Sequence, residues 1–222
     1  MTQFEELLNL QAVLQTSVTA EIRSIGAKYY KSIAAHLSID EVLSLCEKLL
    51  QNNTWAHRVI AYDWAFRSKK KYREDIFPVF EKWLYKYVHG WGDCDDFCTH
   101  AFGELLRQYP DLVTDIYPWT KEPYFWVRRA APVILIYPLR HGVFSNKEVC
   151  RICDALMEET HPLVQKGSGW LLKEYSKISP AFVYSYLEKN VNDMSRTTFR
   201  YALQKLEPKE RTELMALKKT KA

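Results

Sequence analysis

From about residue 38 onward, apolar residues recur at the three- and four-residue spacing of amphipathic helices. The segment "SIDEVLSLCEKLLQN" begins with Ser38 at the N-cap position, and its apolar residues from Val42 to Leu50 share one face. Proline or an N-cap residue separates most of the later segments, as at Pro110, Pro123, Pro162, Pro180 and Pro208. The pattern predicts further helices over residues 57–69, 76–88, 95–109, 111–119, 124–135, 146–159, 162–177, 180–191, 196–206 and 208–218.

One stretch departs from the helical pattern. Residues 132–138, "PVILIYP", have the composition of a strand and a proline at each end. Elsewhere only seven glycines occur in 222 residues, and the hairpin dipeptides Asn-Gly and Asp-Gly are absent. With 47% apolar and 14% aromatic residues the chain can bury a large core, so an all-α globular protein is expected.

The termini and apolar runs indicate a soluble intracellular protein. The start, "MTQFEELLNL", is acidic and amphipathic and lacks the pattern of a signal peptide. The longest apolar run, "PVILIYPL", is too short to span a bilayer, so no membrane association is expected. The five cysteines are an odd number and fit a reducing compartment.

Two cysteine pairs raise the question of a metal site. Cys150 and Cys153 form a C-x-x-C, and Cys94 and Cys98 form a C-x-x-x-C. Both pairs lie in helical patterns without the turn glycines of a zinc knuckle. Ordinary buried thiols are therefore the favoured interpretation, and no metal or other cofactor is expected.

Consecutive helices pair into two-helix units, and a basic residue recurs in the second helix of each unit. Arg58, Arg129, Lys166 and Arg200 are separated by 71, 37 and 34 residues. The 71-residue interval divides into 37 and 34 if one unit lies between, which places Asp95 in the same register. Such spacing is typical of helical solenoids, whose repeats bury their apolar faces by stacking.

A column of cations on one solenoid surface is an electrostatic footprint for a polyanion, most simply a nucleic acid backbone. The +4 formal charge permits this partner without establishing it. Near the amino terminus, "IRSIGAKYYKSIA" interleaves Lys28 with Tyr29, which also suits nucleic acid contact. The basic segment "SKKKYRED" at 68–75 either contacts DNA or solvates a turn. The alternative is a solvated face on a protein-interaction solenoid.

Four stretches, in this order and spacing, make the interpretation more specific: "WGDCD" at 91–95, "FWVRRAAPVIL", "GWLLKEYSKISP" and "RYALQKL". Together they resemble the AlkD-type HEAT-like repeat DNA glycosylases, the bacterial family of DNA alkylation repair enzymes, over nearly the whole chain. The resemblance implies a right-handed solenoid of antiparallel two-helix repeats with a concave surface for duplex DNA. Within "WGDCD" and its continuation, Gly92, Asp96 and two cysteines depart from the family's usual pattern.

The resemblance also implies an activity and its residues. Active members excise purines alkylated at N3 or N7, such as 3-methyladenine and 7-methylguanine, from duplex DNA in base excision repair. The carried-over catalytic residues are Trp91, Asp95, Arg129 and Trp170, with Asp95 stabilising an oxocarbenium-like sugar and positioning water. Arg58, Lys166, Arg200, Lys28 and Tyr29 are the expected DNA contacts. The adduct is expected to stay accessible, without a deep base pocket.

The neighbouring charged residues have simpler expected roles. Asp93 is expected to be an N-cap for a helix starting near Cys94, and Asp96 a first-turn acid. Arg128 points about 100° away from Arg129 and is expected to form a structural ion pair or to lie at the rim of the surface. A metal-dependent nuclease built from Asp93, Asp95 and Asp96 is disfavoured, because adjacent helical positions diverge.

These expectations combine into one hypothesis with two rivals. The hypothesis is a monomeric, metal-independent, monofunctional DNA glycosylase of the bacterial cytoplasm and nucleoid. It forms a single domain over 1–222, with amino-terminal helices at 1–37, repeats at 38–206, and a final helix with a basic tail at 207–222. The rivals are a non-catalytic HEAT-like protein that binds branched or distorted DNA, and a protein-interaction solenoid.

Overall fold

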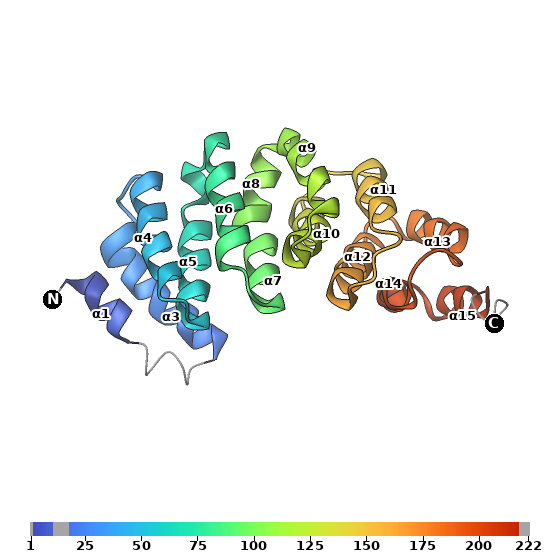
Figure 1. Cartoon of the computed structure of the whole chain (residues 1–222), viewed down its shortest axis with the longest axis horizontal. Helices are drawn as coiled ribbons and strands as arrows, with labels where there is room; N and C mark the ends of the chain where they lie inside the picture. Colours follow the sequence, from blue (N-terminus) through green and yellow to red (C-terminus); the bar gives the residue numbers. More distant parts are fainter. Residues whose placement is uncertain (1, 11–17, 218–222) are drawn as a thin grey trace. The chain divides into compact units, whose positions relative to one another are not determined.

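The computed structural model describes residues 2–10 and 18–217, and all regular structure in these ranges is helical (Figure 1). The all-α prediction is therefore confirmed for the described residues. The basic tail expected at the carboxyl terminus, 218–222, lies outside them. The chain forms two compact units, Met1–Leu105 and Leu106–Ala222, and each is described by itself. The expected single domain, its handedness and its concave surface stay predictions.

The first unit is built from helices that pack side by side. Helix α5 packs against α3, α4 and α7. The helices of this unit are α1 (Gln3–Asn9), α3 (Thr19–Tyr29), α4 (Ile39–Gln51), α5 (Trp55–Arg67), α6 (Phe77–Tyr87), α7 (Trp91–Thr99) and α8 (Ala101–Gln108), with a π-helical turn at Tyr30–Ala34. The sequence boundary of the unit, after Leu105, falls within α8.

Aromatic side chains hold α7 in this unit. The ring of Phe97 in α7 stacks on Tyr62 of α5 at 4.6 Å between centroids, and it meets Phe80 of α6 at 5.2 Å. Trp83 and Phe102 join the same cluster, and these rings are almost fully buried. Burial of such large apolar side chains dominates the stability of a core, so α7 has a fixed position against α5 and α6.

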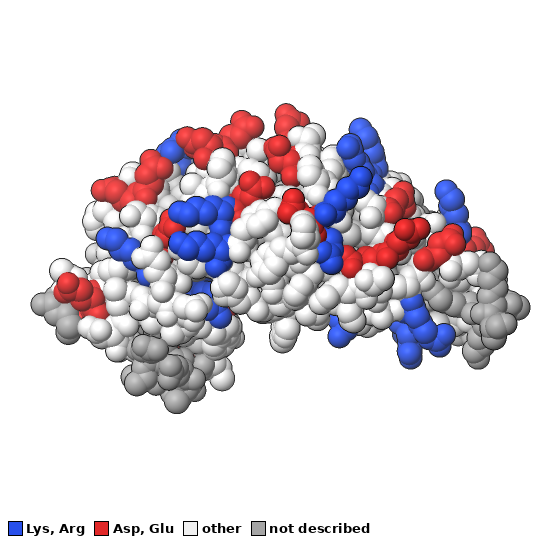
Figure 2. Space-filling model, viewed as in Figure 1, with Lys and Arg blue, Asp and Glu red and all other residues white. Residues whose placement is uncertain are grey.

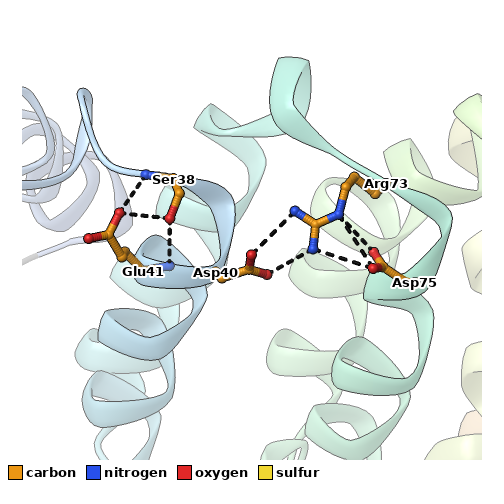
Figure 3. A network of polar contacts seen from close by, with 5 residues as sticks. All are labelled: Ser38, Asp40, Glu41, Arg73 and Asp75. Atoms are coloured by element: carbon orange, nitrogen blue, oxygen red, sulfur yellow. Dashed lines mark hydrogen bonds and ion pairs between the residues drawn. The ribbon is translucent and has the colours of Figure 1, made fainter.

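The starts of α4 and α6 are joined by polar contacts (Figure 3). Ser38 caps α4, as expected, and forms a capping box with Glu41. Arg73 donates to Asp40 at 3.0 Å and to Asp75 at 3.1 Å, so it connects the first turn of α4 with the 3₁₀ turn Glu74–Ile76 that precedes α6. Acidic side chains gather along this upper edge of the first unit (Figure 2).

The basic segment 68–75 has structural contacts. The Lys71 ammonium group donates to the carbonyl oxygens of Ala35 at 3.0 Å and Leu37 at 2.6 Å, directly after the π-helical turn. A cation at the carboxyl end of a helix satisfies carbonyls that lack an intrahelical partner. Lys71 and Arg73 therefore serve the packing of this unit.

The second unit centres on α12, which packs against α10 and α14. A Cβ placed on Gly167 would lie 3.3 Å from Pro132 of α10. A Cβ on Gly169 would lie 2.5 Å from the Tyr201 Cβ of α14 and 2.7 Å from the Thr198 carbonyl oxygen. The two glycines thus allow close approach on two sides of α12. The helices are α9 (Val113–Ile116), α10 (Phe125–Arg140), α11 (Asn146–Ala155), α12 (Pro162–Tyr175), α13 (Pro180–Lys189), α14 (Arg196–Ala202) and α15 (Pro208–Leu217).

Two sequence expectations about local structure are wrong. The stretch "PVILIYP" continues α10 with Pro132 and Pro138 inside the helix, because its apolar side chains are buried in the unit's core. The single helix expected at 95–109 is two helices, α7 and α8, which break at His100. There Thr99 Oγ1 donates to the Asp95 carbonyl at 2.7 Å, a side-chain bond that competes with the helical ladder.

Candidate functional site

Helix α7 carries the "WGDCD" motif. It begins at Trp91 after the N-cap Gly90, so Asp95 is its fifth residue. Trp91 is 64% exposed and Asp95 is half-buried. Four residues along a helix rotate the side chain by about 40°, so Trp91 and Asp95 lie on the same face.

The departures from the family pattern are accommodated in this helix. Gly92 lies inside α7, and a Cβ added there would have no heavy atom within 4 Å. Cys94 and Cys98 are fully buried and pack on the core side. The cysteines of the motif are therefore core residues. No close contact requires a glycine at position 92.

A cleft of about 560 Å³ opens beside the start of α7, entirely within the first unit. Its walls include two large exposed indoles, Trp91 and Trp55, of which Trp55 is 41% exposed. Asp95 is not among the described residues that line it. The lining residues come mainly from α3, α5 and α7 and are Thr19, Arg23, Trp55, Arg58, Val59, His89, Gly90, Trp91, Gly92, Asp93 and Asp96.

Asp93 forms a buried ion pair at the cleft. Arg58 Nε donates to Asp93 Oδ1 at 2.9 Å, and the His89 backbone N–H donates to Asp93 Oδ2 at 3.3 Å. The side chains of Arg58 and Asp93 are 13% and 5% exposed. The N-cap role expected for Asp93 is wrong, because Gly90 is the N-cap and Asp93 is the third residue of α7.

Asp96 joins three parts of the unit. It forms an ion pair with Arg23 of α3, and its Oδ1 lies 3.1 Å from His100 Nδ1. This carboxylate raises the pKa of His100 above its ordinary value, against the opposing effect of burial. The expected first-turn position of Asp96 is wrong, because Asp96 is the sixth residue of α7 and acts through these partners.

The register found in the sequence corresponds to nearly the same position, counted from the start of each helix. The helices α7, α10, α12 and α14 begin at residues 91, 125, 162 and 196, so Asp95, Arg129, Lys166 and Arg200 are each a fifth residue. Arg58 is the fourth residue of α5, which begins at 55. The alignment of the repeats therefore agrees with the observed helix bounds.

The second unit holds the other predicted catalytic residues. Arg129 is only 5% exposed, and its Nη1 donates to the Leu163 carbonyl in the first turn of α12. Trp170 is the half-buried ninth residue of α12. Arg128 binds Glu159 at 2.6 Å and the Glu122 carbonyl at 2.7 Å, which confirms its expected role as a structural ion pair.

Candidate DNA contacts also occur in the second unit. Lys166 is half-buried over the Tyr201 ring, with its Nζ 6.0 Å from the ring centroid, and Arg200 is exposed. Arg200 lines a groove with Arg211 of α15. Figure 2 shows basic side chains at the lower edge of this unit, below α12 and α14. In the first unit, Lys28 is exposed and Tyr29 half-buried at the end of α3.

The sequence profile described as "DNA alkylation repair enzyme" matches residues 16–206. The chain belongs to this family. Family membership implies a role in DNA alkylation repair with DNA as the partner. A search of curated proteins gives no match.

Solved structures agree with the fold of this family member. It is 17% identical to a predicted DNA alkylation repair enzyme from Enterococcus faecalis, at a TM-score of 0.62 over 85% of this chain and 96% of that one. AlkD2 from Streptococcus mutans is 20% identical, with a TM-score of 0.67 over 91% of this chain and 98% of that one. The protein smu.31 from Streptococcus mutans UA159 is 20% identical, with a TM-score of 0.67 over 93% of this chain and 100% of that one.

Two structural findings concern metal and membrane. Within residues 2–10 and 18–217, no group of three or more His, Cys, Asp or Glu side chains lies close enough together to hold a metal ion. Burial raises the pKa of the Cys153 thiol and, less strongly, that of Cys150.

None of the described helices has the length and apolar character needed to cross a bilayer.

Sequence reasoning missed Trp55 and the partners of Asp96. A signal for Trp55 was present in the sequence. Trp55 lies three residues before Arg58, and Trp91 lies four residues before Asp95, the residue aligned with Arg58 in the repeats. The Arg23–Asp96 pair joins residues 73 positions apart and carries no local signal.

Proposed function

We propose that this family member is a DNA N-glycosylase that excises cationic N3- and N7-alkylated purines, including 3-methyladenine and 7-methylguanine, from duplex DNA in base excision repair. The observation that carries the proposal is the exposed Trp91 at the start of α7, beside an open cleft and one turn before Asp95 on the same face. An aromatic face and a carboxylate at this spacing suit a cationic reaction centre.

The chemistry follows from the charge of the substrate. Alkylation at N3 or N7 makes the purine a cation, which weakens the glycosidic bond and lets the base leave without a general acid. The remaining requirement is to stabilise the oxocarbenium-like sugar and to position a water that captures it. Asp95 supplies the negative charge, and Trp91 supplies a π face for the cationic centre.

The residues of the second unit are assigned roles that stay predictions. Trp170 is half-buried and keeps part of its indole available for a cationic sugar or adduct. Arg129 is assigned to the site by its motif, and in this structure it also supports the first turn of α12. Each is tested by its own substitution.

DNA binding is assigned to cations that fix the duplex without reading its sequence. Lys166 and Arg200 occupy the same level of neighbouring helices, and Lys28 with Tyr29 adds a contact from α3. Arg58 lines the cleft but is already paired with Asp93, so its contribution is to the shape of the binding surface. We place this monofunctional, metal-independent enzyme in the bacterial cytoplasm, as a monomer on the nucleoid.

The deciding experiment incubates the protein with duplex DNA carrying 7-methylguanine or 3-methyladenine and measures released base. Wild type should release both, and Asp95→Asn should lower the single-turnover rate by about 100-fold or more, as loss of a transition-state charge does. Asp193→Asn is the matched control, because Asp193 is exposed in the second unit.

The other outcomes separate the rival functions. Salt-dependent duplex binding without release of either base would contradict the glycosylase and favour a non-catalytic DNA-binding protein. Absence of duplex binding would favour a protein-interaction role. Equal release by wild type and Asp95→Asn would show that the activity stands and that the role of Asp95 is wrong.

A further inference from the structure

A groove of about 590 Å³ lies within the second unit and is lined by residues of α14, of the turn that follows it and of α15. Two arginines line it, Arg200 of α14 and Arg211 of α15, and none of the described lining residues is acidic. In the cleft beside α7, by contrast, each of the two arginines is paired with an aspartate. The groove therefore carries an excess of positive charge. Its other lining residues are Leu203, Pro208, Thr212, Met215 and Ala216.

Helix α15 separates its charges between two faces. It packs against α13, and there Glu213 accepts a hydrogen bond from the Tyr184 hydroxyl at 3.4 Å. Arg211 lies two residues before Glu213, which places it about 200° around the helix. Met215 lies one turn beyond Arg211 on the same face, and both line the groove. The carboxylate therefore serves the packing of α15 on α13, and the guanidinium group is left on the groove side.

The two guanidinium groups of the groove are open to a ligand. Arg200 and Arg211 are exposed, and neither forms an ion pair with another residue in 2–10 or 18–217. A guanidinium group presents a rigid fork of N–H donors that matches the oxygens of a phosphate. Basic side chains gather at the lower edge of this unit, below α12 and α14 (Figure 2). The groove thus offers phosphate donors at a basic edge of the unit.

The sugar–phosphate backbone of DNA is the partner that fits this groove. Its phosphates complement the two arginines, and the half-buried Met215 offers an apolar surface to a deoxyribose. Family membership already implies DNA as the partner. The family profile ends at residue 206, however, and α15 begins at Pro208. A contact from Arg211 would therefore belong to this chain rather than to the matched family pattern.

We propose that α15 adds a contact with the DNA backbone, in which Arg211 binds a phosphate in the groove that it shares with Arg200. The proposal rests on the duplex binding assigned above and not on base release. It extends the DNA-binding surface past Arg200, which is the last predicted contact along the chain. Because a phosphate contact carries no information about the base, it acts on alkylated and unmodified duplex alike.

The test measures binding of an unmodified, end-labelled duplex to the full chain by fluorescence anisotropy at several salt concentrations. Arg211→Ala should reduce the slope of log K against log salt by about 0.9 and weaken binding by about 3- to 10-fold near about 0.1 M salt. Arg211→Lys should keep most of the slope, because it keeps the charge. Lys209→Ala is the matched control, since Lys209 is exposed on the same helix, 4.0 Å from Glu213, and does not line the groove.

Two results would overturn the contact. Equal slopes for Arg211→Ala and Lys209→Ala would show that the groove binds no DNA phosphate and that only net charge matters. Inorganic phosphate tests a second source of the same ligand chemistry. If phosphate at constant ionic strength raises the melting temperature of wild type but not of Arg211→Ala, while both have the same DNA slope, the groove binds free phosphate and the DNA contact is wrong. Equal melting temperatures without phosphate show that the variants are folded.

The outcomes also separate this contact from the glycosylase activity. If Arg211→Ala reduces the slope while wild type releases no alkylated base, the contact stands and the glycosylase proposal fails. If wild type releases base and Arg211→Ala keeps the wild-type slope, the contact is wrong and the glycosylase stands. Absence of duplex binding by wild type would contradict both.

Discussion

Arg58 of α5 and Asp93 of α7 form a buried ion pair 35 residues apart in sequence, with 2.9 Å between Nε and Oδ1. Removing one partner leaves the other charge buried without compensation. Asp93→Ala should therefore lower the free energy of unfolding by about 3–5 kcal/mol in urea denaturation. The double variant Arg58→Met/Asp93→Leu should recover most of the loss.

The control for this pair is Lys82→Ala, since Lys82 binds Glu47 at 2.7 Å while its own side chain is 56% exposed. Breaking such a solvent-screened surface pair should change the free energy of unfolding far less than Asp93→Ala does. An Asp93→Ala loss as small as that of Lys82→Ala would contradict the structural role given to the buried pair.

The glycines of α12 and α7 should respond oppositely to alanine. Gly169→Ala places a methyl group 2.7 Å from the Thr198 carbonyl and should destabilise the protein by about 1–3 kcal/mol. Gly92→Ala meets no atom within 4 Å and should stabilise by about 0.4–1 kcal/mol, because alanine restricts the unfolded chain more. Thermal and urea unfolding measure both, and the same sign for the two variants would refute the packing described for α12.

His100 should make stability depend on pH. Asp96 raises the pKa of His100 above its ordinary 6.5, so the folded state binds the proton more tightly than the unfolded chain. The stabilisation is fully present below pH 6.5 and is lost as the pH rises through the raised value. Melting temperatures of wild type and His100→Gln, measured between about pH 5 and 8, should differ most at the acidic end.

The difference between variants isolates this effect from a second histidine. Burial lowers the pKa of His57, so that group opposes folding as the pH falls. The contribution of His57 to stability is the same in wild type and in His100→Gln, so it cancels in their difference. A difference that grows toward alkaline pH would contradict the pairing of His100 with Asp96.

Lys71 should matter for stability more than its neighbour Lys70. Lys71→Met removes two hydrogen bonds to the carbonyls of Ala35 and Leu37 and should lower the free energy of unfolding by about 0.5–1 kcal/mol. Lys70 is exposed in the same turn, so Lys70→Met is the matched control and should be nearly neutral. Equal effects in chemical denaturation would contradict the capping role of Lys71.

Arg200 should contribute to DNA binding without regard to damage. Arg200→Ala should weaken binding to alkylated and unmodified duplex alike and reduce the salt dependence of log K by about one phosphate contact. Lys147→Ala, an exposed cation at the start of α11, should leave that slope unchanged. Fluorescence anisotropy at several salt concentrations measures both, and selective loss for damaged DNA would show that Arg200 contacts the lesion instead.

The sequence predicted what is encoded locally. Ser38 caps α4 as expected, and Pro162 and Pro180 begin helices at the first helical position. The repeat register was also accessible, because the fifth residue of a helix recurs at intervals of 34 or 37 residues. Such signals need only neighbouring residues or a period.

Features that depend on distant residues were not predictable. Asp93 reads as a helix cap until Arg58 is found beside it, and the exposure of Trp55 depends on how α5 and α7 meet. In the same way, the sequence around Pro132 resembles a strand boundary. Its place inside α10 depends on the burial of that helix on several sides, which local sequence does not show. Pattern reasoning therefore placed Asp95 in a helix but missed the bounds of that helix and the cleft beside it.

The division of tryptophans between core and cleft has a spectroscopic consequence. Trp64 and Trp83 are closed to solvent, so a water-soluble quencher should leave their fluorescence largely intact, while it should reach Trp55 and Trp91. Trp170 of the second unit is also partly exposed, so quencher accessibility reports on the cleft in a Trp170→Phe variant. A ligand that fills the cleft would protect Trp55 and Trp91 from the quencher. Its affinity could therefore be measured from the intrinsic tryptophan fluorescence.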